Sequence, residues 1–417
     1  MTGELISSND NSPKSHFFLD IGFKIVILAN KRKFVKLCGD FLDPLIAKLP
    51  SSSTRVALVY NIKAEAPPLS SSVGSTTQPL TRESLSSVND IYAEWDTPET
   101  VNAVRTALEE RHSVMMIEAD EEAFEKLRSM RPDFVFNIAE GLHGPSREAQ
   151  IPAMLEMLQI PYLGSDPLTL GICLDKARAK EILSYNKIPT PHFTVVRSIE
   201  ELDDVRVRFP SMVKPLHEGS SKGIYNSSVV RSAEELEREV QAVLSAYAEP
   251  ALIEEFLPGR EFTVALLGNA EDVRVLPIVE IRFDALPPGM NPIYSYEAKW
   301  IWDSSDAPLE IFDCPAKLEP SLREEIETLC LDAYRVLGCR DWSRIDVRLD
   351  AAGRAHIMEI NPLPGILPKP EDNSCFPKAA RAAGMSYNQL INTVMDIAMQ
   401  RCGLLADVHN HHRAALG

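Results

Sequence analysis

The chain has 417 residues, of which 45% are hydrophobic and 25% charged, so it is long enough for two or three globular domains with sizeable cores. Acidic residues outnumber basic ones by 60 to 43, and the net charge of -17 argues against a general nucleic-acid binder, which needs a basic surface. The seven cysteines are scattered without a metal-binding spacing, which favours free thiols in a reducing cytoplasm.

The two ends of the chain differ from its middle. Residues 1–53 lack the basic and apolar regions of a signal peptide, and their apolar run is interrupted by Asp20 and Lys24, so we expect an N-terminal extension and no membrane span. Residues 405–417 hold three of the nine histidines and are interpreted as a polar tail. No membrane partner is expected.

The first regular elements alternate between strands and helices. Strand-like runs at 53–61, 114–119 and 133–141 surround a helical pattern at 98–112, and a Ser/Thr/Pro-rich loop follows the first strand. This alternation is typical of an α/β protein. We expect a small doubly wound domain over residues 54–167.

A second domain is expected over residues 168–261. It begins in a single long helix at 166–187 and continues through strands near 209–215 and 251–257. Between those strands the loop "PLHEGSSKGI" contains glycines and serines, which can present N–H groups and hydroxyls to an anion. The spacing excludes a Walker A loop, and an ordinary hairpin tip would look similar.

A third domain is expected over residues 262–404, and it contains the hairpin "RIDVRLD" and "AHIMEIN" around a short turn. If Asp350 pairs with Ala355, counting back places Asp346 opposite Glu359 and Arg344 opposite Asn361. All four then share one face, while Val347 and Met358 lie on the other face.

Two carboxylates across a ladder repel each other unless a cation lies between them. The oxygen and amide ligands Asp346, Glu359 and Asn361 suit Mg²⁺ or Mn²⁺ rather than zinc. A solvated acidic hairpin is the alternative, and a one-residue slip in register would separate the acids. Because magnesium usually arrives with phosphates, a phosphate-bearing ligand is expected near this hairpin.

Acids at the end of the strand in "LIEEFLPGREF" can accept hydrogen bonds from an adenine amine or a ribose hydroxyl, although surface acids would look the same. Lysines near the Gly/Ser loop offer charge for phosphates. The spacing and order of these features decide between the two interpretations.

The chain resembles the D-alanine–D-alanine ligase family of the ATP-grasp superfamily from about residue 136 to residue 398. The segments that carry the resemblance occur in the family's order: "LQIPYLGSDPLTLGICLDKARAK", "VKPLHEGSSKGI", "LIEEFLPGREFTVALL", "YSYEAKW", "SRIDVRLD", "MEINPLPG" and "SCFPKAARAAGMSYNQL". The resemblance implies a fold of the α/β (α+β) class, with two ATP-grasp subdomains after the small N-terminal domain.

The resemblance also implies an ATP site, with Ser220 and Ser221 in a mobile loop that covers the phosphates. Glu254, Glu255 and the backbone near Leu257 would meet adenine, and Glu261 the ribose. The residues implied for ATP are Lys176, Lys214, Ser220, Ser221, Glu254, Glu255, Leu257, Glu261 and Lys299.

Two Mg²⁺ ions would be held by Asp346, Glu359 and Asn361, and Mn²⁺ could replace them. The implied catalytic residues are Arg344, which would face the developing oxyanion, with Lys299, Ser220 and the Gly365 amide. Gly365 and Ser374 would also bind substrate oxygen and carboxylate. These groups fit transfer of a phosphoryl group to a carboxylate and attack of an amine on the resulting acyl phosphate.

The departures from the family lie on the substrate side. The family's donor-binding glutamate has only a loose counterpart in Glu65, and the stretch after His143 reads "GPSREAQ", in which Arg147 could meet an anionic donor. Trp300 replaces the usual tyrosine or phenylalanine. His143, Arg147, Trp300, Arg344, Gly365 and Ser374 are the expected substrate residues.

The expected function is ATP-dependent ligation of amino-acid-like small molecules, with D-alanine–D-alanine ligation for the cell wall as the first candidate. A ligase of secondary metabolism with another donor, and a regulatory ATP binder that has lost catalysis, are the alternatives. No nucleic-acid partner is expected, and a homodimer is left open.

Overall fold

The computed structural model describes residues 54–63, 93–141, 143–302 and 309–405. They belong to one compact unit that begins at Thr54. The predicted N-terminal extension, the loop containing Glu65 and the polar tail after Leu405 therefore lie outside the described residues. Within the described part of the chain, no helix has the length and apolar character needed to cross a membrane.

The first sheet is three-stranded and parallel, with the strand order β2-β1-β3. Its strands are Arg55–Tyr60, Ser113–Glu118 and Phe134–Asn137 for β1, β2 and β3. Alternate residues of β1 pack on opposite faces: Val56 and Leu58 lie in one hydrophobic cluster, and Ala57 and Val59 in another. Both faces are therefore covered, as expected for a doubly wound domain.

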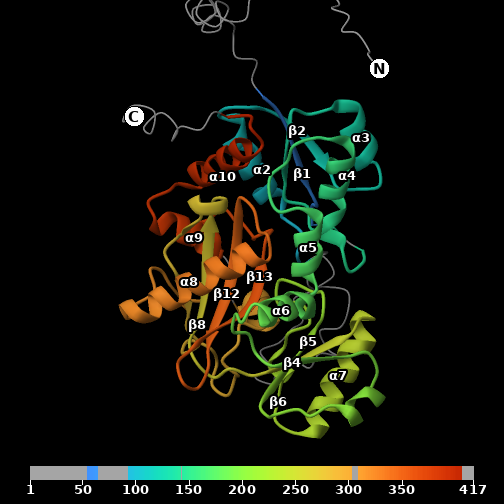
Figure 1. Ribbon diagram of the computed structural model, residues 1–417, viewed down its shortest axis with the longest axis vertical. Coiled ribbons are helices and arrows are strands. Elements are labelled where there is room, and N and C mark those ends of the chain that lie inside the picture. The colour runs from blue at the N-terminus through green and yellow to red at the C-terminus, as the bar shows by residue number, and fades with distance from the viewer. Residues whose placement is uncertain (1–53, 64–92, 142, 303–308, 406–417) are drawn as a thin grey trace, which may run out of the picture. The chain divides into compact units, whose positions relative to one another are not determined.

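The helices on these two faces come from different parts of the chain. One face packs against α2 (Pro98–Glu109) and against α10 (Tyr387–Arg401), the last helix of the chain (Figure 1). The other face packs against α3 (Ala123–Met130) and α4 (Gln150–Leu158). Residues near the C-terminus thus complete the core of the N-terminal sheet.

The single helix predicted over 166–187 is wrong, because the structure contains two helices, α5 (Pro167–Leu174) and α6 (Lys176–Tyr185). Asp175 between them is extended, with φ -80° and ψ 94°, and its carboxylate accepts hydrogen bonds from the N–H groups of Ala177 and Arg178. A short acid that caps a new helix competes with continuation of the old one. The break makes Lys176 the first residue of α6.

The second sheet is antiparallel, with the strand order β4-β7-β5-β6, and α7 (Ala233–Tyr247) packs on it. Its strands β4 to β7 are, in chain order, Phe193–Val196, Ser211–Pro215, Val229–Val230 and Ala251–Glu255. The Gly/Ser loop, residues 216–224, connects β5 to the segment before β6.

The third sheet has the order β11-β10-β8-β12-β13, and β9 pairs with β8. Its strands β8 to β13 are Glu261–Leu267, Arg274–Val275, Val279–Ile281, Phe312–Asp313, Trp342–Leu349 and Ala355–Asn361. The helix α8 (Pro320–Val336) packs on this sheet. The helix α9 (Cys375–Ala382) lies between the sheet and α10 (Figure 1). The predicted α/β class is therefore confirmed.

The three predicted domains from residue 54 onward correspond to these three sheets, but their boundaries stay a proposal. The first and third sheets share one hydrophobic cluster, in which Trp342 lies edge-on between Phe136 and Phe376 with ring centroids 5.9 and 5.7 Å apart. A sheet-by-sheet division of the chain would cut through this core.

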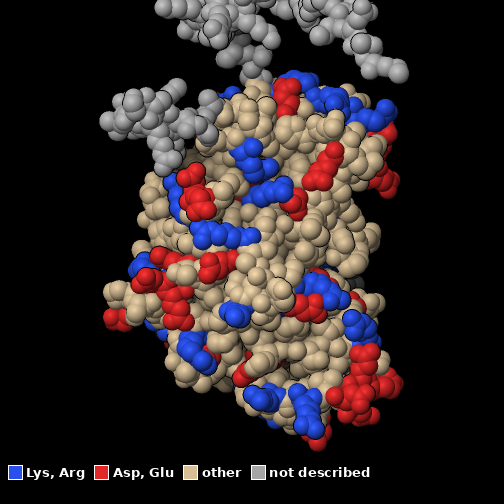
Figure 2. Space-filling model, in the orientation of Figure 1, with Lys and Arg blue, Asp and Glu red and all other residues tan. Residues whose placement is uncertain are grey.

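Surface charge agrees with the acidic composition. On the face drawn in Figure 2, acidic and basic side chains are interspersed, and the described residues there form no continuous basic surface. This face lacks the feature that phosphate backbones require of a general nucleic-acid binder.

A buried ion pair fastens α10 to the rest of the unit. The Asp341 carboxylate is fully buried and accepts hydrogen bonds from Nε and Nη2 of Arg401 at 2.8 and 2.7 Å. It also accepts from the Gly164 N–H at 2.8 Å and the Asn269 side-chain amide at 2.8 Å. One carboxylate thus joins segments near residues 164, 269 and 401.

We predict that Asp341→Asn lowers the free energy of unfolding by about 3 kcal/mol, because removal of one partner leaves Arg401 without its counter-ion. The matched control is Asp396→Asn. Asp396 lies on α10, as Arg401 does, and its exposed pair with Arg111 should contribute less than about 1 kcal/mol. Urea unfolding of the three proteins measures both values. Equal losses in the two variants would contradict the role given to Asp341.

Candidate active site

The described residues enclose a cavity of about 520 Å³ whose walls come from strands of the second and third sheets, from loops, and from segments that flank the strands of the first sheet. Most of the predicted site residues line it: Lys176, Lys214, Ser220, Ser221, Glu261, Lys299, Trp300, Arg344, Asp346, Glu359, Asn361, Gly365 and Ser374. Five do not line it: His143, Arg147, Glu254, Glu255 and Leu257. The sequence therefore located the cavity but misjudged part of its wall.

The hairpin of β12 and β13 forms the centre of the cavity. Asp346 pairs with Glu359 and Arg344 with Asn361, as predicted. The turn is different, because Leu349 rather than Asp350 pairs with Ala355, and the register shifts after Asp346. The extra residue of this bulge is Met358, which lines the cavity instead of the opposite face. The turn is one residue longer than predicted, and β13 carries one extra residue at the bulge. These two errors cancel at the pairing of Asp346 with Glu359.

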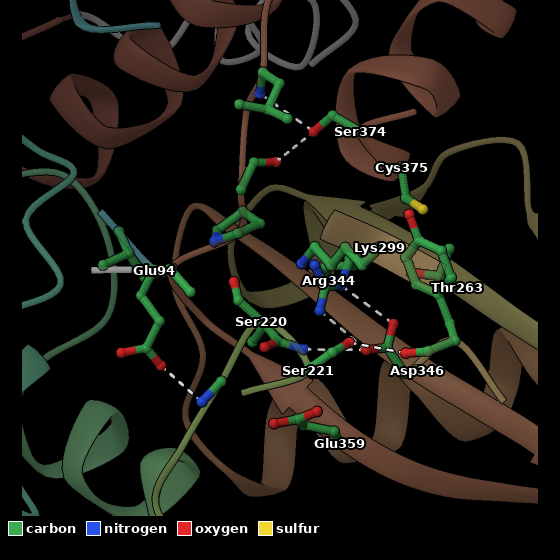
Figure 3. Close-up of a pocket in the computed structure, with 18 of the residues that line it drawn as sticks. Glu94, Ser220, Ser221, Thr263, Lys299, Arg344, Asp346, Glu359, Ser374 and Cys375 are labelled. Atoms are coloured by element: carbon green, nitrogen blue, oxygen red, sulfur yellow. Dashed lines mark hydrogen bonds and ion pairs between the residues drawn. The ribbon is translucent and has the colours of Figure 1, made fainter. Parts of the chain in front are cut away.

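Each carboxylate of this hairpin has a cationic partner. Asp346 accepts hydrogen bonds from Nε and Nη2 of Arg344 at 3.2 and 3.0 Å, and from the Asn361 amide at 3.3 Å (Figure 3). Lys176 Nζ lies 3.2 Å from Glu359 Oε1. The break at Asp175, which makes Lys176 the first residue of α6, thus helps to bring this lysine to the hairpin.

The pKa values follow from burial opposed by these charges. Burial would raise the pKa of the Glu359 carboxyl, but Lys176, Lys214 and Arg344 lower it below its usual value. Burial would lower the pKa of Arg344, but Asp346 raises it above its usual value. Both groups therefore carry charge at neutral pH.

The oxygen set at this hairpin fits magnesium. Among the described residues no cluster of three His, Cys, Asp or Glu side chains could hold a metal by itself. Two carboxylates and an amide suit an ion that takes its remaining ligands from phosphates and water. The hydroxyl of Thr263, paired with Asp346 across β8 and β12, is buried without a hydrogen-bond partner in the described part of the chain, so it adds a further oxygen here.

Beyond the hairpin, Lys214 on β5 is held in position by a buried ion pair. The Glu254 carboxylate is fully buried, in an ion pair with Lys214 and at 3.1 Å from Lys180 Nζ. Burial would raise its pKa, but the two lysines lower it to about 2. The contact between this carboxylate and adenine expected from sequence disagrees with its position, because the side chain faces the two lysines and not the cavity. Its effect on the site is to position Lys214.

The acid predicted for the ribose lies in the cavity with a partner that the sequence analysis did not include. Arg348 Nη1 donates to Glu261 Oε2 at 2.7 Å, and its guanidinium lies 4.8 Å from the ring centroid of Phe256. Burial, opposed by Arg348, raises the pKa of Glu261. Alternation along "RIDVRLD" would have placed Arg348 on the face of Arg344 and Asp346, so the signal was present.

The Gly/Ser loop lines the cavity and is held there by hydrogen bonds to the segment around Trp300. The Ser220 carbonyl accepts a hydrogen bond from the Trp300 indole N–H at 3.0 Å, and the Ser221 hydroxyl donates to the Tyr294 carbonyl at 2.9 Å. The Lys299 ammonium lies 5.3 Å from the Trp300 ring centroid. Burial, with Arg344 nearby, lowers the pKa of Lys299 to about 8. Lys299 therefore loses its proton in the slightly alkaline range.

The loop between β13 and α9 forms the last wall. The Ser374 hydroxyl donates to the Gly365 carbonyl at 3.1 Å and accepts from the Leu367 N–H at 3.2 Å (Figure 3). Gly365 and Ser374, the two residues predicted to bind the acceptor substrate, therefore lie together in the wall of the cavity.

Comparison with known proteins decides what kind of site this is. A family model described as D-ala D-ala ligase C-terminus matches residues 182–396. "Uncharacterized protein y4sG" of Sinorhizobium fredii is 38% identical over 74% of this chain and 89% of its own length. The D-alanine–D-alanine ligase of Pelotomaculum thermopropionicum is 31% identical over 73% of this chain and 92% of its own length.

A solved structure agrees at the level of the fold. The D-alanine–D-alanine ligase of Bacillus anthracis complexed with ATP superposes with a TM-score of 0.59 and 22% identity, over 84% of this chain and 98% of that one. The chain belongs to the D-alanine–D-alanine ligase family. It is accordingly an ATP-using, ADP-forming ligase-like enzyme of the ATP-grasp fold that acts on small molecules.

The family's donor-side glutamate has a different candidate here. Glu94, in the segment before α2, lines the cavity and accepts a hydrogen bond from the Gly219 N–H at 2.6 Å (Figure 3). The sequence analysis missed it because it lies in none of the segments that carry the family resemblance. His143 is exposed away from the cavity, and Arg147 is buried beside Glu94 rather than facing a substrate.

The cavity wall around Glu94 is acidic. Burial raises the pKa of Asp96 to about 7, and burial together with Glu94 raises that of Glu148 to about 8. Burial and Glu148 raise the pKa of Glu140 well above its usual value. None of these three carboxyls forms an ion pair with a described residue, so this end of the ligase cavity contrasts with the cationic end near Lys214.

We predict that Glu359→Gln lowers turnover by roughly 100-fold or more, because one charge for the metal is lost at nearly constant volume. The decrease is measured as ADP release across a magnesium titration, with thermal unfolding to show that the fold persists. Glu271→Gln, at an exposed position, is the matched control. A Glu359→Gln enzyme with the wild-type magnesium dependence would contradict the metal assignment.

We predict that ATP affinity weakens as the pH rises through about 8, where Lys299 loses its proton and can no longer neutralise phosphate. The loss should reach roughly tenfold, since a hydrogen bond to a charged group contributes about 1.5–3 kcal/mol. Calorimetric titration of ATP across this pH range measures it. Lys299→Arg keeps its charge and should remove the inflection, whereas an inflection that persists in this variant would assign it to another group.

Proposed function

We propose that the chain joins two amino-acid-like substrates through an amide bond, with D-alanyl-D-alanine as the first candidate product. One observation carries the proposal: a single cavity contains two carboxylates with an amide at its centre, four phosphate-compatible cations around them and a Gly/Ser loop along its wall. The relatives named D-alanine–D-alanine ligases support the choice of first candidate.

The cations suit the first step, in which a donor carboxylate oxygen attacks the γ-phosphorus of ATP and ADP leaves. Lys176 and Lys214 would neutralise the ATP phosphates, and Lys299 would contact the phosphoryl group in transfer. Glu261, fixed by Arg348, would accept from a ribose hydroxyl. Magnesium, bound by Asp346, Glu359 and Asn361 together with the phosphates, would supply charge neutralisation for this transfer.

The electrostatics of the ligand-free site suggest an exchange of partners. Lys176 and Arg344 are paired with Glu359 and Asp346 in the chain alone. Once metal charge balances those carboxylates, both cations become available to anionic oxygen. The hairpin would thereby release its own cations when the nucleotide arrives with magnesium.

In the second step the acceptor amine attacks the carbonyl carbon of the acyl phosphate, and phosphate leaves. Arg344 and the Gly365 N–H would stabilise the oxyanion of the tetrahedral intermediate, and Ser374 would bind the acceptor carboxylate. The Gly/Ser loop would exclude water, which competes with the amine for the same carbon. The products are an amide, ADP and phosphate.

The donor end favours a second candidate, a ligase of the same chemistry with a donor other than D-alanine. Glu94 is already paired with Arg147, and three further carboxyls line this wall. Such a wall would stabilise an ammonium group, which D-alanine shares with other amino acids. Glu94, however, already has Arg147 as its partner, and this is the observation that favours a donor other than D-alanine. The six free cysteines among the described residues support a reducing, cytoplasmic setting. Assembly into a homodimer stays a proposal.

The test is ADP release from ATP and magnesium with D-alanine alone, and then with pairs of D- and L-amino acids, with mass spectrometry of the products. We expect D-alanyl-D-alanine or a related dipeptide together with one ADP. A dipeptide formed only from other pairs would support the second candidate. ATP binding without turnover across the whole panel would contradict the ligase proposal and favour a regulatory ATP binder.

A further inference from the structure

A buried ion pair crosses the donor end of the cavity and touches the Gly/Ser loop. Arg147 Nη2 lies 2.8 Å from both carboxylate oxygens of Glu94, and the two side chains are 6% and 7% exposed. The same nitrogen donates to the His217 carbonyl at 3.0 Å and lies 3.3 Å from Glu218 Oε2. Glu94 in turn accepts from the Gly219 N–H at 2.6 Å. We call Glu94, Arg147 and their contacts with residues 217–219 the latch.

The latch connects segments that are far apart in sequence. Glu94 precedes α2, Arg147 begins the 3₁₀ turn Arg147–Ala149, and the loop follows β5. Other bonds hold the loop to different segments, including Lys176 Nζ to the Glu218 carbonyl and the Trp300 indole to the Ser220 carbonyl. Only the latch, among the described contacts of residues 217–221, ties this loop to the N-terminal sheet's domain.

The approach of Glu94 to the loop depends on glycine at position 219. A Cβ atom at this position would lie 2.6 Å from Glu94 Oε1, which is shorter than a normal van der Waals contact. The N–H of Gly219 is therefore within reach of the carboxylate only because that residue has no side chain.

Within the latch, the carboxylates of Glu94 and Glu218 balance the charge of Arg147. Burial would lower its pKa, but Glu94 and Glu218 raise it above its usual value, so it stays protonated. It is also absent from the cavity lining. An anionic donor could recruit this guanidinium only by leaving buried carboxylates unpaired, which is unfavourable. Its chemistry is that of a structural cation and not of a substrate ligand.

We propose that Glu94 and Arg147 are positioning residues that hold the Gly/Ser loop shut over the acyl phosphate and so couple ATP use to amide formation. The inference rests on the proposed function. With the loop open, water attacks the acyl carbon, the bond from that carbon to the phosphate oxygen breaks, and donor carboxylate, phosphate and a proton are released. ATP would then be consumed without amide. The latch prevents this loss by excluding water from one side.

The test measures ADP formed per amide formed, together with hydrogen exchange of residues 217–223 in the ligand-free chain. Arg147→Met should raise the ratio from about one to severalfold and speed exchange of the loop at least tenfold. Arg105→Met, which removes an exposed pair with Glu109 on α2, is the matched control and should change neither value. A ratio of one and unchanged exchange in Arg147→Met would overturn the proposal.

A second variant keeps the test decisive if Arg147→Met does not fold. Gly219→Ala leaves both charges in place but forces Glu94 away from the loop, so it should raise the ratio and the exchange rate in the same way. If both values stay as in the wild type, the proposal fails.

The outcomes separate this inference from the proposed function. Wild-type chain that forms no amide from any pair contradicts the function, and loop exchange in the variants still decides whether the latch holds. Amide formation with unaltered ratio and exchange in both variants refutes the latch and leaves the function standing.

Discussion

Two carboxylates that face each other across one antiparallel ladder impose the main electrostatic constraint on this protein. Asp346 and Glu359 would repel each other at their paired positions, so the fold must supply positive charge around them. Arg344 supplies it from the same strand, and Lys176 supplies it from the first residue of a helix. The ion pair of Lys176 with Glu359 and the lowered pKa of the Glu359 carboxyl can both be understood from this requirement.

The same constraint divides the cavity into two ends of opposite character. Around the hairpin, cations outnumber what the two carboxylates need, which suits a polyphosphate accompanied by metal. Around Glu94, carboxyls outnumber cations, and burial, together with the charge of neighbouring carboxylates, raises the pKa values of Glu140 and Glu148. A ligase that activates one substrate with ATP and holds a second, zwitterionic one has use for both ends. The loop that closes between them is bonded to each.

The sequence predicted the centre of the site better than its periphery. The pairing of Asp346 with Glu359 followed from strand alternation and a short turn, although a bulge at Met358 compensated for a turn that was one residue longer than expected. Alternation would also have identified Arg348. The contribution of α10 to the first sheet's core could not be predicted, because hydrophobic periodicity says which face is buried and not which partner buries it.

The remaining errors concern side chains whose roles depend on tertiary contacts. Glu254 stands at a strand end where an adenine contact was reasonable, yet two lysines from other segments surround its carboxylate. Arg147 was expected to meet a substrate, and its partners come from positions 94 and 218. Nothing in the local sequence distinguishes a buried structural cation from a ligand-binding one.

The most direct test of the central claim is to follow the donor's carboxylate oxygen. With a donor labelled with ¹⁸O in its carboxylate, an acyl phosphate requires that one labelled oxygen appears in the inorganic phosphate released during amide formation. Mass spectrometry of that phosphate decides the question. Labelled inorganic phosphate is the predicted result. Unlabelled phosphate, or label in a nucleoside monophosphate, would contradict the account.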